Sequence, residues 1–282
     1  MLVINKRIFL LEHLNLNRSE GKTIGFVPTM GALHDGHVSL VKRAKMENDI
    51  AVASIFINPT QFNNPEDLKH YPRTLDEDKK MLMDAGCDIL FFPETDEMYP
   101  QGLKETSKDL DLGGLENVME GAHRPGHFMG VIQVVKKLFD AVGPCKSYFG
   151  EKDFQQLAVV RKMVKEWQLP IEIIGCPIVR ENDGLAMSSR NTRLSIEERK
   201  IAPLISSALF QAKEMWRTNG VEEIKEKVSQ IISAASQFRL EYFEISDAET
   251  LQPIRDNQKT NVVGCIAVQL GNVRLIDNIM LG

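Results

Sequence analysis

The sequence predicts a doubly wound (Rossmann-like) α/β domain with a parallel sheet, followed by a smaller C-terminal α+β domain. Two observations support this. The first two-thirds of the chain alternates short apolar runs with amphipathic stretches, and from about residue 177 two helix-like stretches precede strand-like runs. Strand–helix–strand alternation with buried, β-branched strands indicates a parallel sheet with helices on both faces. We expect the domains to span residues 1–176 and 177–282.

The elements of the first domain follow from its hydrophobic pattern. Short β-branched apolar runs predict strands at 23–27, 50–57, 87–92, 145–149 and 171–176. Amphipathic stretches between them predict helices at 38–48, 75–85, 126–141 and 153–167. Ligands of this fold class bind at the carboxyl ends of the strands. The turns that follow the strands are therefore where we look for function.

The second domain reads as helices followed by antiparallel strands. Two helices are predicted at 196–218 and 221–236, and three strands at 240–245, 262–270 and 273–279. Gly271 and Asn272 separate the last two strands, which predicts a tight hairpin turn.

Composition limits the classes of function. The net charge of −5 and the pI of about 5.8 give no basic footprint, which argues against nucleic-acid or anionic-membrane binding. No apolar run is long enough for a membrane span, and the N-terminus lacks the features of a signal peptide. The four cysteines form no CxxC pair, so we interpret them as reduced thiols of a cytoplasmic protein. Small molecules are the expected partners.

The stretch PTMGALHDGH, residues 28–37, is the turn from the first predicted strand into a helix expected to begin near His37. The free amides at a helix start favour anions, and Gly31 and Gly36 let the backbone approach a phosphate. Together with those amides, His34 and His37 can bind a triphosphate and stabilise the charge that develops on it. A metal pair or two surface histidines are the alternatives, although no nearby cysteine or third histidine completes a metal site.

A second stretch, DGLAMSSRN at 183–191, lies at the predicted domain junction. Ser188, Ser189 and Arg190 supply two hydroxyls and a planar cation in a row, which suits phosphate oxygens. The alternative is a helix start, because Ser195 and Glu198 form a capping-box pattern just beyond it.

The HxGH turn and the distal SSR triplet resemble the HIGH and KMSKS signatures of the nucleotidylyltransferase superfamily, which includes the class I aminoacyl-tRNA synthetases. The match is closer to the pantoate–β-alanine ligase (pantothenate synthetase) family. Its signatures are PTMGALHDGH, IFINPTQF, YPRTLDED, RPGHFMGVIQVV, YFGEKDFQQL and DGLAMSSRN, which span roughly the first 190 residues. The C-terminal third matches in layout rather than in motif.

The resemblance implies a two-step ligation in which ATP activates pantoate as pantoyl adenylate, releasing pyrophosphate, and β-alanine then displaces AMP. The implied catalytic residues are His37, as proton donor, with His34, Lys152, Ser188, Ser189 and Arg190. The implied ATP contacts are Met30, Gly31, Ala32, Leu33, His34, Asp35, Gly36, His37, Gly150, Glu151, Lys152, Asp153, Val179, Met187, Ser188, Ser189 and Arg190.

For pantoate the resemblance implies Gln61, Gln156, Asn58 and Met30, and for β-alanine Gln61 and Arg124. The two glutamines can both donate and accept hydrogen bonds, as a ligand with a carboxylate and two hydroxyls requires. Arg124 could instead be a surface cation at a helix entry. Each of the glutamines, taken without the motif, would read as a solvated surface residue.

Several points stay open. Asp153 could hold the ATP ribose or only cap a helix. Mg²⁺ is implied by ATP chemistry, and the run Asp76-Glu77-Asp78 is either an acidic contributor or a solvated helix start, so no metal ligand is assigned. Another nucleotidylyltransferase and a catalytically silent nucleotide-binding module are the competing functions. A homodimer and a lid role for the second domain are further expectations, the dimer from resemblance alone.

Overall fold

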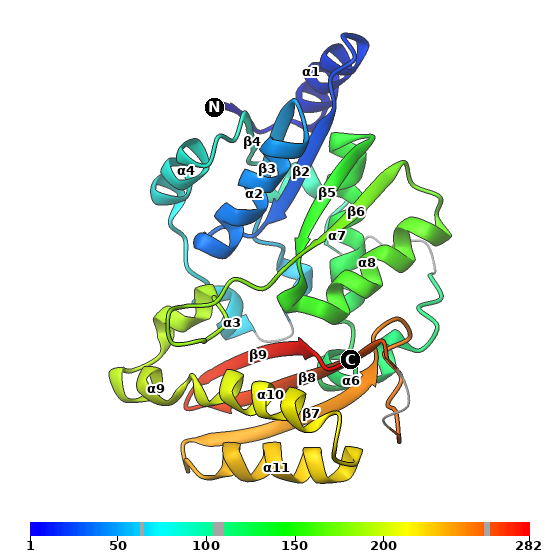
Figure 1. Cartoon of the computed structure of the whole chain (residues 1–282). Coiled ribbons are helices and arrows are strands. Elements are labelled where there is room, and N and C mark those ends of the chain that lie inside the picture. The colour runs from blue at the N-terminus through cyan, green and yellow to red at the C-terminus, as the bar shows by residue number, and fades with distance from the viewer. Residues whose placement is uncertain (63–64, 104–109, 257–259) are drawn as a thin grey trace. The chain divides into compact units, whose positions relative to one another are not determined.

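The computed structural model describes residues 1–62, 65–103, 110–256 and 260–282 (Figure 1). It divides into two compact units. The first contains Met1–Gly113, Arg124–Glu151 and Gln156–Pro177, and the second contains Gly114–His123, Lys152–Gln155 and Ile178–Gly282. The second unit thus includes two short segments from the N-terminal part of the chain. The domain boundary after residue 176 stays a prediction.

The first unit contains a six-stranded, fully parallel sheet in the order β1-β4-β3-β2-β5-β6. Its strands are β1 (Leu2–Ile4), β2 (Ile24–Thr29), β3 (Ile50–Ile55), β4 (Ile89–Phe91), β5 (Cys145–Gly150) and β6 (Ile171–Cys176). The order extends in both directions from the neighbouring strands β2 and β5, as in a doubly wound fold. The predicted fold class is confirmed, and the turn after β2 lies at the switch point.

Helices cover this sheet on both faces. Neighbouring residues of β2 point to opposite faces and pack against different helices. Val27 joins a buried cluster with Val41 of α2 (Asp35–Glu47) and Leu82 of α4 (Leu75–Asp84). Phe26 packs edge-on against Phe139 of α7 (His127–Val142), with ring centroids 6.4 Å apart. The other helices of this part of the chain are α1 (Arg7–Ser19), α3 (Pro65–Lys69), α5 (Thr95–Met98) and α8 (Phe154–Glu166).

Most of the predicted elements of the first domain are found with small shifts at their ends, but the N-terminus differs. No element was predicted before Thr23, yet β1 pairs with β4 at the sheet edge and α1 follows it. β1 has only three residues, too few for a pattern, and its pairing with a strand 85 or more positions away is a tertiary effect.

The second unit has an antiparallel sheet of β7 (Phe238–Asp247), β8 (Val262–Leu270) and β9 (Val273–Met280) in that order. The predicted hairpin is confirmed, since Gly271 and Asn272 alone link the paired Leu270 and Val273, and Gly271 has a φ of +54°. The helices are α6 (Met119–His123), α9 (Ile196–Ile201), α10 (Leu204–Met215) and α11 (Val221–Ser233). The single helix predicted at 196–218 is therefore wrong: Pro203 separates α9 from α10, as its missing N–H favours.

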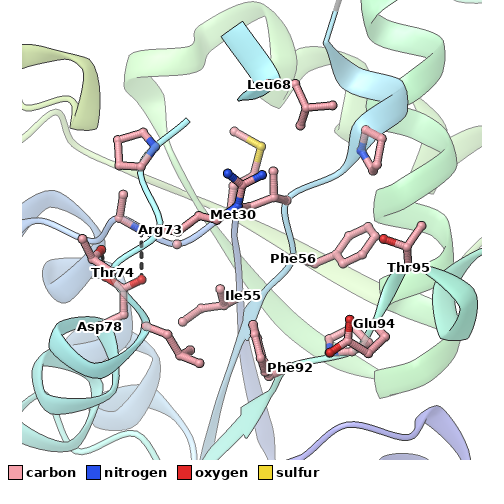
Figure 2. Close-up of a pocket in the computed structure, with 17 residues that line it drawn as sticks. Met30, Ile55, Phe56, Leu68, Arg73, Thr74, Asp78, Phe92, Glu94 and Thr95 are labelled. Atoms are coloured by element: carbon pink, nitrogen blue, oxygen red, sulfur yellow. Dashed lines mark hydrogen bonds between the residues drawn. The ribbon is translucent and has the colours of Figure 1, made fainter. Parts of the chain in front are cut away.

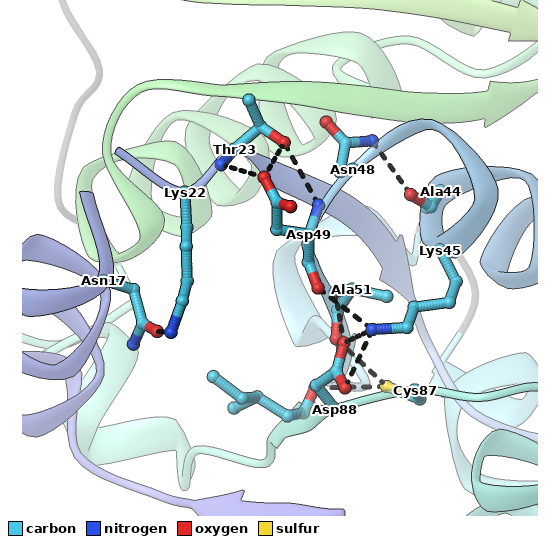
Figure 3. Close-up of polar contacts among 11 residues, drawn as sticks. Asn17, Lys22, Thr23, Ala44, Lys45, Asn48, Asp49, Ala51, Cys87 and Asp88 are labelled. Carbon is cyan, nitrogen blue, oxygen red and sulfur yellow. Dashed lines mark hydrogen bonds and ion pairs between the residues drawn. The ribbon is translucent and has the colours of Figure 1, made fainter. Parts of the chain in front are cut away.

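A polar network joins the amino ends of the central strands, at the end of the sheet opposite the β2 turn (Figure 3). Lys45 of α2 donates to the carboxylate of Asp88, at 2.9 and 3.1 Å, and Asp88 accepts from the backbone of Ala51. Asp49 accepts from both the N–H and the hydroxyl of Thr23, each at 2.8 Å. These contacts fix the register of β2, β3 and β4 where each strand begins.

Asp49 should make stability depend on pH on the acid side. The hydrogen bonds from Thr23 lower the pKa of this carboxyl below its ordinary value. A lowered folded-state pKa contributes stability above the unfolded value, about 3.9, and that contribution is lost as the pH falls through the folded value. We expect Asp49→Asn to lower the Tm at about pH 7, and the difference from the unmodified protein to shrink as the pH falls below about 3.9. The exposed Asp84→Asn is the control, and a pH-independent difference in Tm for Asp49→Asn would contradict the assignment.

The cysteines and the helices add two findings. Cys87, Cys145, Cys176 and Cys265 are all free, and burial raises the pKa of each thiol, for Cys87 to about 11. A raised pKa disfavours the thiolate, so none of the four cysteines is suited to act as a nucleophile.

Over the residues that the structure describes, no helix is both long and apolar enough to cross a membrane.

Candidate active site

The turn after β2 has a strained backbone. Gly31 and Ala32 lie in the left-handed region, with φ of +82° and +49°. Alanine seldom adopts this conformation, and such strain persists only where the surroundings hold it. A side chain on residue 31 would also approach Asp78 and Ile55 to 3.1 Å. Gly31 is therefore required for the shape of the turn itself.

Asp78 of α4 holds this turn. One carboxylate oxygen accepts from the N–H of Ala32 at 2.9 Å, and the other accepts from the N–H of Leu33 at 2.8 Å and from the hydroxyl of Thr74 at 3.1 Å. The residue is only 2% exposed. The sequence left the acidic run open between a metal contributor and a solvated helix start, and for Asp78 neither interpretation holds, because its carboxylate is committed to the backbone of the turn.

His34 and His37 cap the start of α2 reciprocally. Nδ1 of His34 accepts from the N–H of Gly36 at 3.1 Å, and Nδ1 of His37 accepts from the N–H of His34 at 3.4 Å. The ring centroids are 4.1 Å apart. A neutral imidazole whose Nδ1 accepts carries its proton on Nε2. The capping arrangement therefore makes Nε2 of each histidine a donor.

This geometry corrects one expectation and sharpens another. The helix begins at Asp35 rather than near His37, because His34 is its N-cap. Free amides at the helix start were expected to favour an anion, but the amides of Gly36 and His37 donate to the ring and to the backbone oxygen of His34. Anion binding at this turn would therefore depend mainly on the imidazole Nε2 donors.

A cavity of about 480 Å³ opens at the carboxyl ends of β2, β3 and β4 (Figure 2). The residues that follow each of these strands line it, and the first turn of α4 closes one side. Most of its lining is apolar, and Arg73, Thr74, Asp78, Glu94 and Thr95 are its polar members. Of the predicted site residues, it includes Met30, Gly31 and Ala32. Ligands of doubly wound folds bind at this end of the sheet.

The 3₁₀ helix η1 (Pro59–Gln61) carries Gln61 and follows β3. Just before it, Asn58 is fully buried: its amide donates to the backbone oxygen of Gly130 at 3.1 Å and its oxygen accepts from the hydroxyls of Tyr99 and Thr60. Asn58 was predicted to contact pantoate. These hydrogen bonds hold η1 in place, and the contact of Asn58 with pantoate stays a prediction.

Gln61 is brought together with Arg124. The backbone oxygen of Gln61 accepts from Nδ1 of the buried His127 at 3.0 Å and from the guanidinium of Arg124 at 3.4 Å. Arg124 also contacts Nε2 of His127 at 3.2 Å, so His127 bridges the two residues. Arg124 does stand at a helix entry, before α7, but it is half-buried against η1 rather than a solvated surface cation. His127 was not identified from the sequence, although it lies within the quoted RPGHF motif.

Gly130 allows α7 to pass directly over η1. A Cβ on residue 130 would lie 2.4 Å from the backbone oxygen of Thr60 and 3.2 Å from Cα of Gln61. Because these are backbone atoms, Gly130→Ala should push η1 away, lower stability by about 1–3 kcal/mol and raise the KM for the substrate that Gln61 binds. Steady-state kinetics and thermal unfolding measure both effects. Gly220→Ala, where no atom lies within 4 Å, is the control; an unchanged KM for Gly130→Ala would contradict the role of η1.

The segment after β5 contains the next predicted residues. Gly150 ends β5, and Glu151, Lys152 and Asp153 form the 3₁₀ helix η3 before α8, on which Gln156 lies. Asp153 is exposed on η3, and its two predicted roles stay open. Gly150, Glu151 and Gln156 belong to the first unit and Lys152 and Asp153 to the second.

The remaining predicted residues form a folded loop in the second unit. Met187 donates its backbone N–H to the oxygen of Val179 at 3.0 Å, which closes the loop from 179 to 187. Ser188 then caps the 3₁₀ helix η4 (Ser189–Arg193), its hydroxyl accepting from the N–H of Arg190 at 3.3 Å. The helix-start interpretation of the SSR triplet is thus correct for the backbone, and the capping box of Ser195 and Glu198 is confirmed beyond it.

Relatives of known name match this chain over nearly its full length. The family model for pantoate-beta-alanine ligase matches residues 3–280. A pantothenate synthetase from Bacteroides fragilis is 53% identical over 280 residues, covering 99% of this chain and 98% of its own length. The pantothenate synthetase of Flavobacterium psychrophilum is 49% identical with full coverage of both chains.

Solved structures agree. A pantothenate synthetase from Thermus thermophilus superposes with a TM-score of 0.92 at 43% identity, covering 100% of this chain and 99% of that one. A pantoate-beta-alanine ligase from Francisella tularensis, complexed with beta-gamma ATP and beta-alanine, gives a TM-score of 0.81 at 36% identity, with 100% and 98% coverage. Fold, motifs and full-length similarity agree, and the chain belongs to the pantoate-beta-alanine ligase family.

Proposed function

We propose that this chain is a ligase that condenses pantoate with β-alanine in an ATP-dependent reaction through a pantoyl adenylate, releasing AMP and pyrophosphate. The observation that carries the proposal is the family match over residues 3–280 of a chain whose HxGH turn lies at the carboxyl end of β2. A carboxylate is a poor acyl donor until its oxygen bears a good leaving group. Adenylation provides that group, and the amine of β-alanine then forms the amide as AMP departs.

In the first step, negative charge builds on the phosphates, so positioned donors matter more than a protein nucleophile. His34 and His37 supply Nε2–H donors from a turn that Asp78 holds rigid. His37 is the proton donor of the pair in this proposal. Support comes from the reciprocal capping, which fixes both the tautomer and the orientation of each ring before substrate arrives.

Lys152 and the Ser188–Arg190 triplet act on the phosphates from the second unit. Ser188 and Ser189 carry hydroxyls and Arg190 a guanidinium that can engage phosphate oxygens. Gly150, Glu151, Asp153, Val179 and Met187 complete the proposed ATP contacts. We further propose that residues 177–282 work as a lid, because shielding the adenylate from water would prevent its hydrolysis. Small-angle scattering with and without ATP plus pantoate tests the lid, and an unchanged profile would argue against it.

Gln61, Gln156, Asn58 and Met30 are the proposed pantoate contacts. The support for Gln61 is its placement on η1: His127 and Arg124 donate to its backbone oxygen, and the amide of Asn58 donates to its side-chain oxygen at 3.5 Å. Gln61 and Arg124 are also the proposed β-alanine contacts. Among the described residues, the cavity of Figure 2 includes Met30 but neither glutamine.

The side chains of the described residues form no metal cage of their own. Among the described residues, no group of three or more histidine, cysteine, aspartate or glutamate side chains could hold an ion together. Both oxygens of Asp78 are committed to the turn. Mg²⁺ therefore belongs to the proposal only as the companion of ATP, since this ion is commonly bound through substrate phosphates.

The reaction can be tested directly with the purified chain. Incubation with ATP, Mg²⁺, pantoate and β-alanine should release AMP and pyrophosphate only with the complete set of substrates. Tight ATP binding without turnover would favour a silent nucleotide-binding module. Turnover with another acceptor but not with pantoate would favour a different nucleotidylyltransferase; the glutamines of the NPTQF and FQQL motifs argue against that alternative.

Three further expectations belong to the proposal. The homodimer is based on resemblance alone, and light scattering of the purified chain tests it. A cytoplasmic location is supported by the four free cysteines. Binding of nucleic acid or a membrane surface is not expected, because the net charge is −5.

A further inference from the structure

Asp277 and Asn278 on β9 contact both cation-bearing segments of the second unit. They are 3% and 5% exposed, although the strand around them is otherwise apolar at its buried positions. One neighbour is Lys152 and the other is the loop that leads to Ser188. No sequence motif marks this pair, and the family resemblance assigned no role to it.

Asn278 fixes the backbone at Lys152. Its side-chain amide donates to the backbone oxygen of Lys152 at 2.9 Å, across 126 positions of sequence. At the other end of the same short segment, the buried Gln155 donates to the backbone oxygens of Leu115 and Val118. The segment that carries Lys152 is thus held at both ends by other parts of the second unit.

Asp277 fixes the loop that leads to the serine–arginine triplet. Its carboxylate forms a two-pronged ion pair with Arg180, at 2.6 and 3.0 Å. The same guanidinium donates to the backbone oxygens of Gly184, at 3.0 Å, and of Asn278, at 3.3 Å. Arg180 therefore ties both sides of the loop to β9. A backbone bridge from Arg180 to Ala186 then leads directly into Ser188.

The charges reinforce this arrangement. Asp277 lies within electrostatic reach of Lys152 as well as in contact with Arg180, and burial raises the pKa of its carboxyl while both cations oppose that shift. A carboxylate in this position links the two segments through charge as well as through hydrogen bonds. Two adjacent residues of one strand thus hold both segments, which lie more than 20 positions apart in sequence.

We propose that Asp277 and Asn278 are positioning residues that set the placement of Lys152 relative to Ser188–Arg190, and so align the donors that act on the triphosphate during adenylation. This inference depends on the proposed function. Electrostatic stabilisation of a transition state requires donors fixed in advance, and a misplacement of about 1 Å can cost on the order of 10²-fold in rate. The pair acts on the first step only, because the triphosphate is gone before β-alanine attacks.

The two half-reactions separate this role from a merely structural one. Pantoate-dependent exchange of pyrophosphate into ATP reports adenylation, and release of AMP from supplied pantoyl adenylate with β-alanine reports the second step. In the full chain, we expect Asn278→Ala and Asp277→Asn to lower the exchange rate on the order of 10- to 10²-fold and to leave the second half-reaction within about twofold. Asn278→Ser, which keeps a donor, should recover part of the loss.

Lys225→Met is the matched control, because it removes one half-buried ion pair of the same unit, to Glu244, which takes no part in the contacts of Asp277 and Asn278. It should leave both half-reactions intact. Parallel loss of both half-reactions in the β9 variants, or an exchange rate within about twofold of the unmodified chain, would overturn the inference. If Asn278→Ala fails to unfold cooperatively, the two half-reactions of Asp277→Asn alone test the inference. An unmodified chain without either half-reaction would instead refute the proposed function.

Discussion

Replacing His37 by alanine should lower kcat on the order of 10²-fold or more while changing the Kd for ATP little, as for loss of one oxyanion-type donor. The reason is that Nε2–H of His37 is fixed by the capping bond of its Nδ1 and is proposed to serve the transition state more than the bound substrate. Steady-state kinetics and isothermal titration with ATP measure the two effects separately.

The capping role of His37 requires its own control, because alanine also removes the acceptor for the N–H of His34. Glutamine is a common capping-box residue at this helix position and retains an acceptor and a neutral donor. His37→Gln should therefore regain thermal stability without regaining kcat. His13→Ala, at an exposed position of α1, should change neither quantity. Equal losses in kcat and ATP affinity for His37→Ala would reassign this residue to binding.

Asp78→Ala should have the second largest effect, on both stability and activity. It leaves the N–H groups of Ala32 and Leu33 and the hydroxyl of Thr74 without their acceptor in a buried site. Hydrogen bonds to a charged acceptor contribute about 1.5–3 kcal/mol each, so we expect a loss of about 3 kcal/mol or more in the free energy of unfolding. The left-handed backbone at Ala32 would then relax, and kcat/KM should fall with it.

Chemical denaturation and steady-state kinetics at a temperature where the variant is folded measure these effects. Asp78→Asn is the sharper variant, because its NH₂ group would face a backbone N–H while the volume of the side chain is unchanged. Asp76→Ala, exposed on the same first turn of α4, is the matched control and should behave like the unmodified chain. A stable, fully active Asp78→Ala variant would show that the turn holds its shape without this carboxylate.

His37 and Asp78 differ in how far the sequence identified their roles. His37 was identified because HxGH follows an apolar run and precedes an amphipathic one, so a local pattern placed it at a strand-to-helix turn. Asp78 was recognised only as part of an acidic run, and its partners lie 45 and 46 positions earlier in the chain. Hydrophobic periodicity describes residues within one helix or strand, so it cannot predict a contact over that separation.

The same contrast holds across the molecule. By itself the sequence determined the parallel strands, most helices, the Gly271-Asn272 hairpin and the family, because burial pattern, turn residues and contiguous motifs are local properties. Only the tertiary structure decided that β1 adds to the sheet edge, that Gly130 lets α7 touch η1, and that Lys152 is held by Asn278 of β9. Each of these depends on atoms brought together by packing from distant parts of the chain, and close packing is a property of the whole fold rather than of any stretch of sequence.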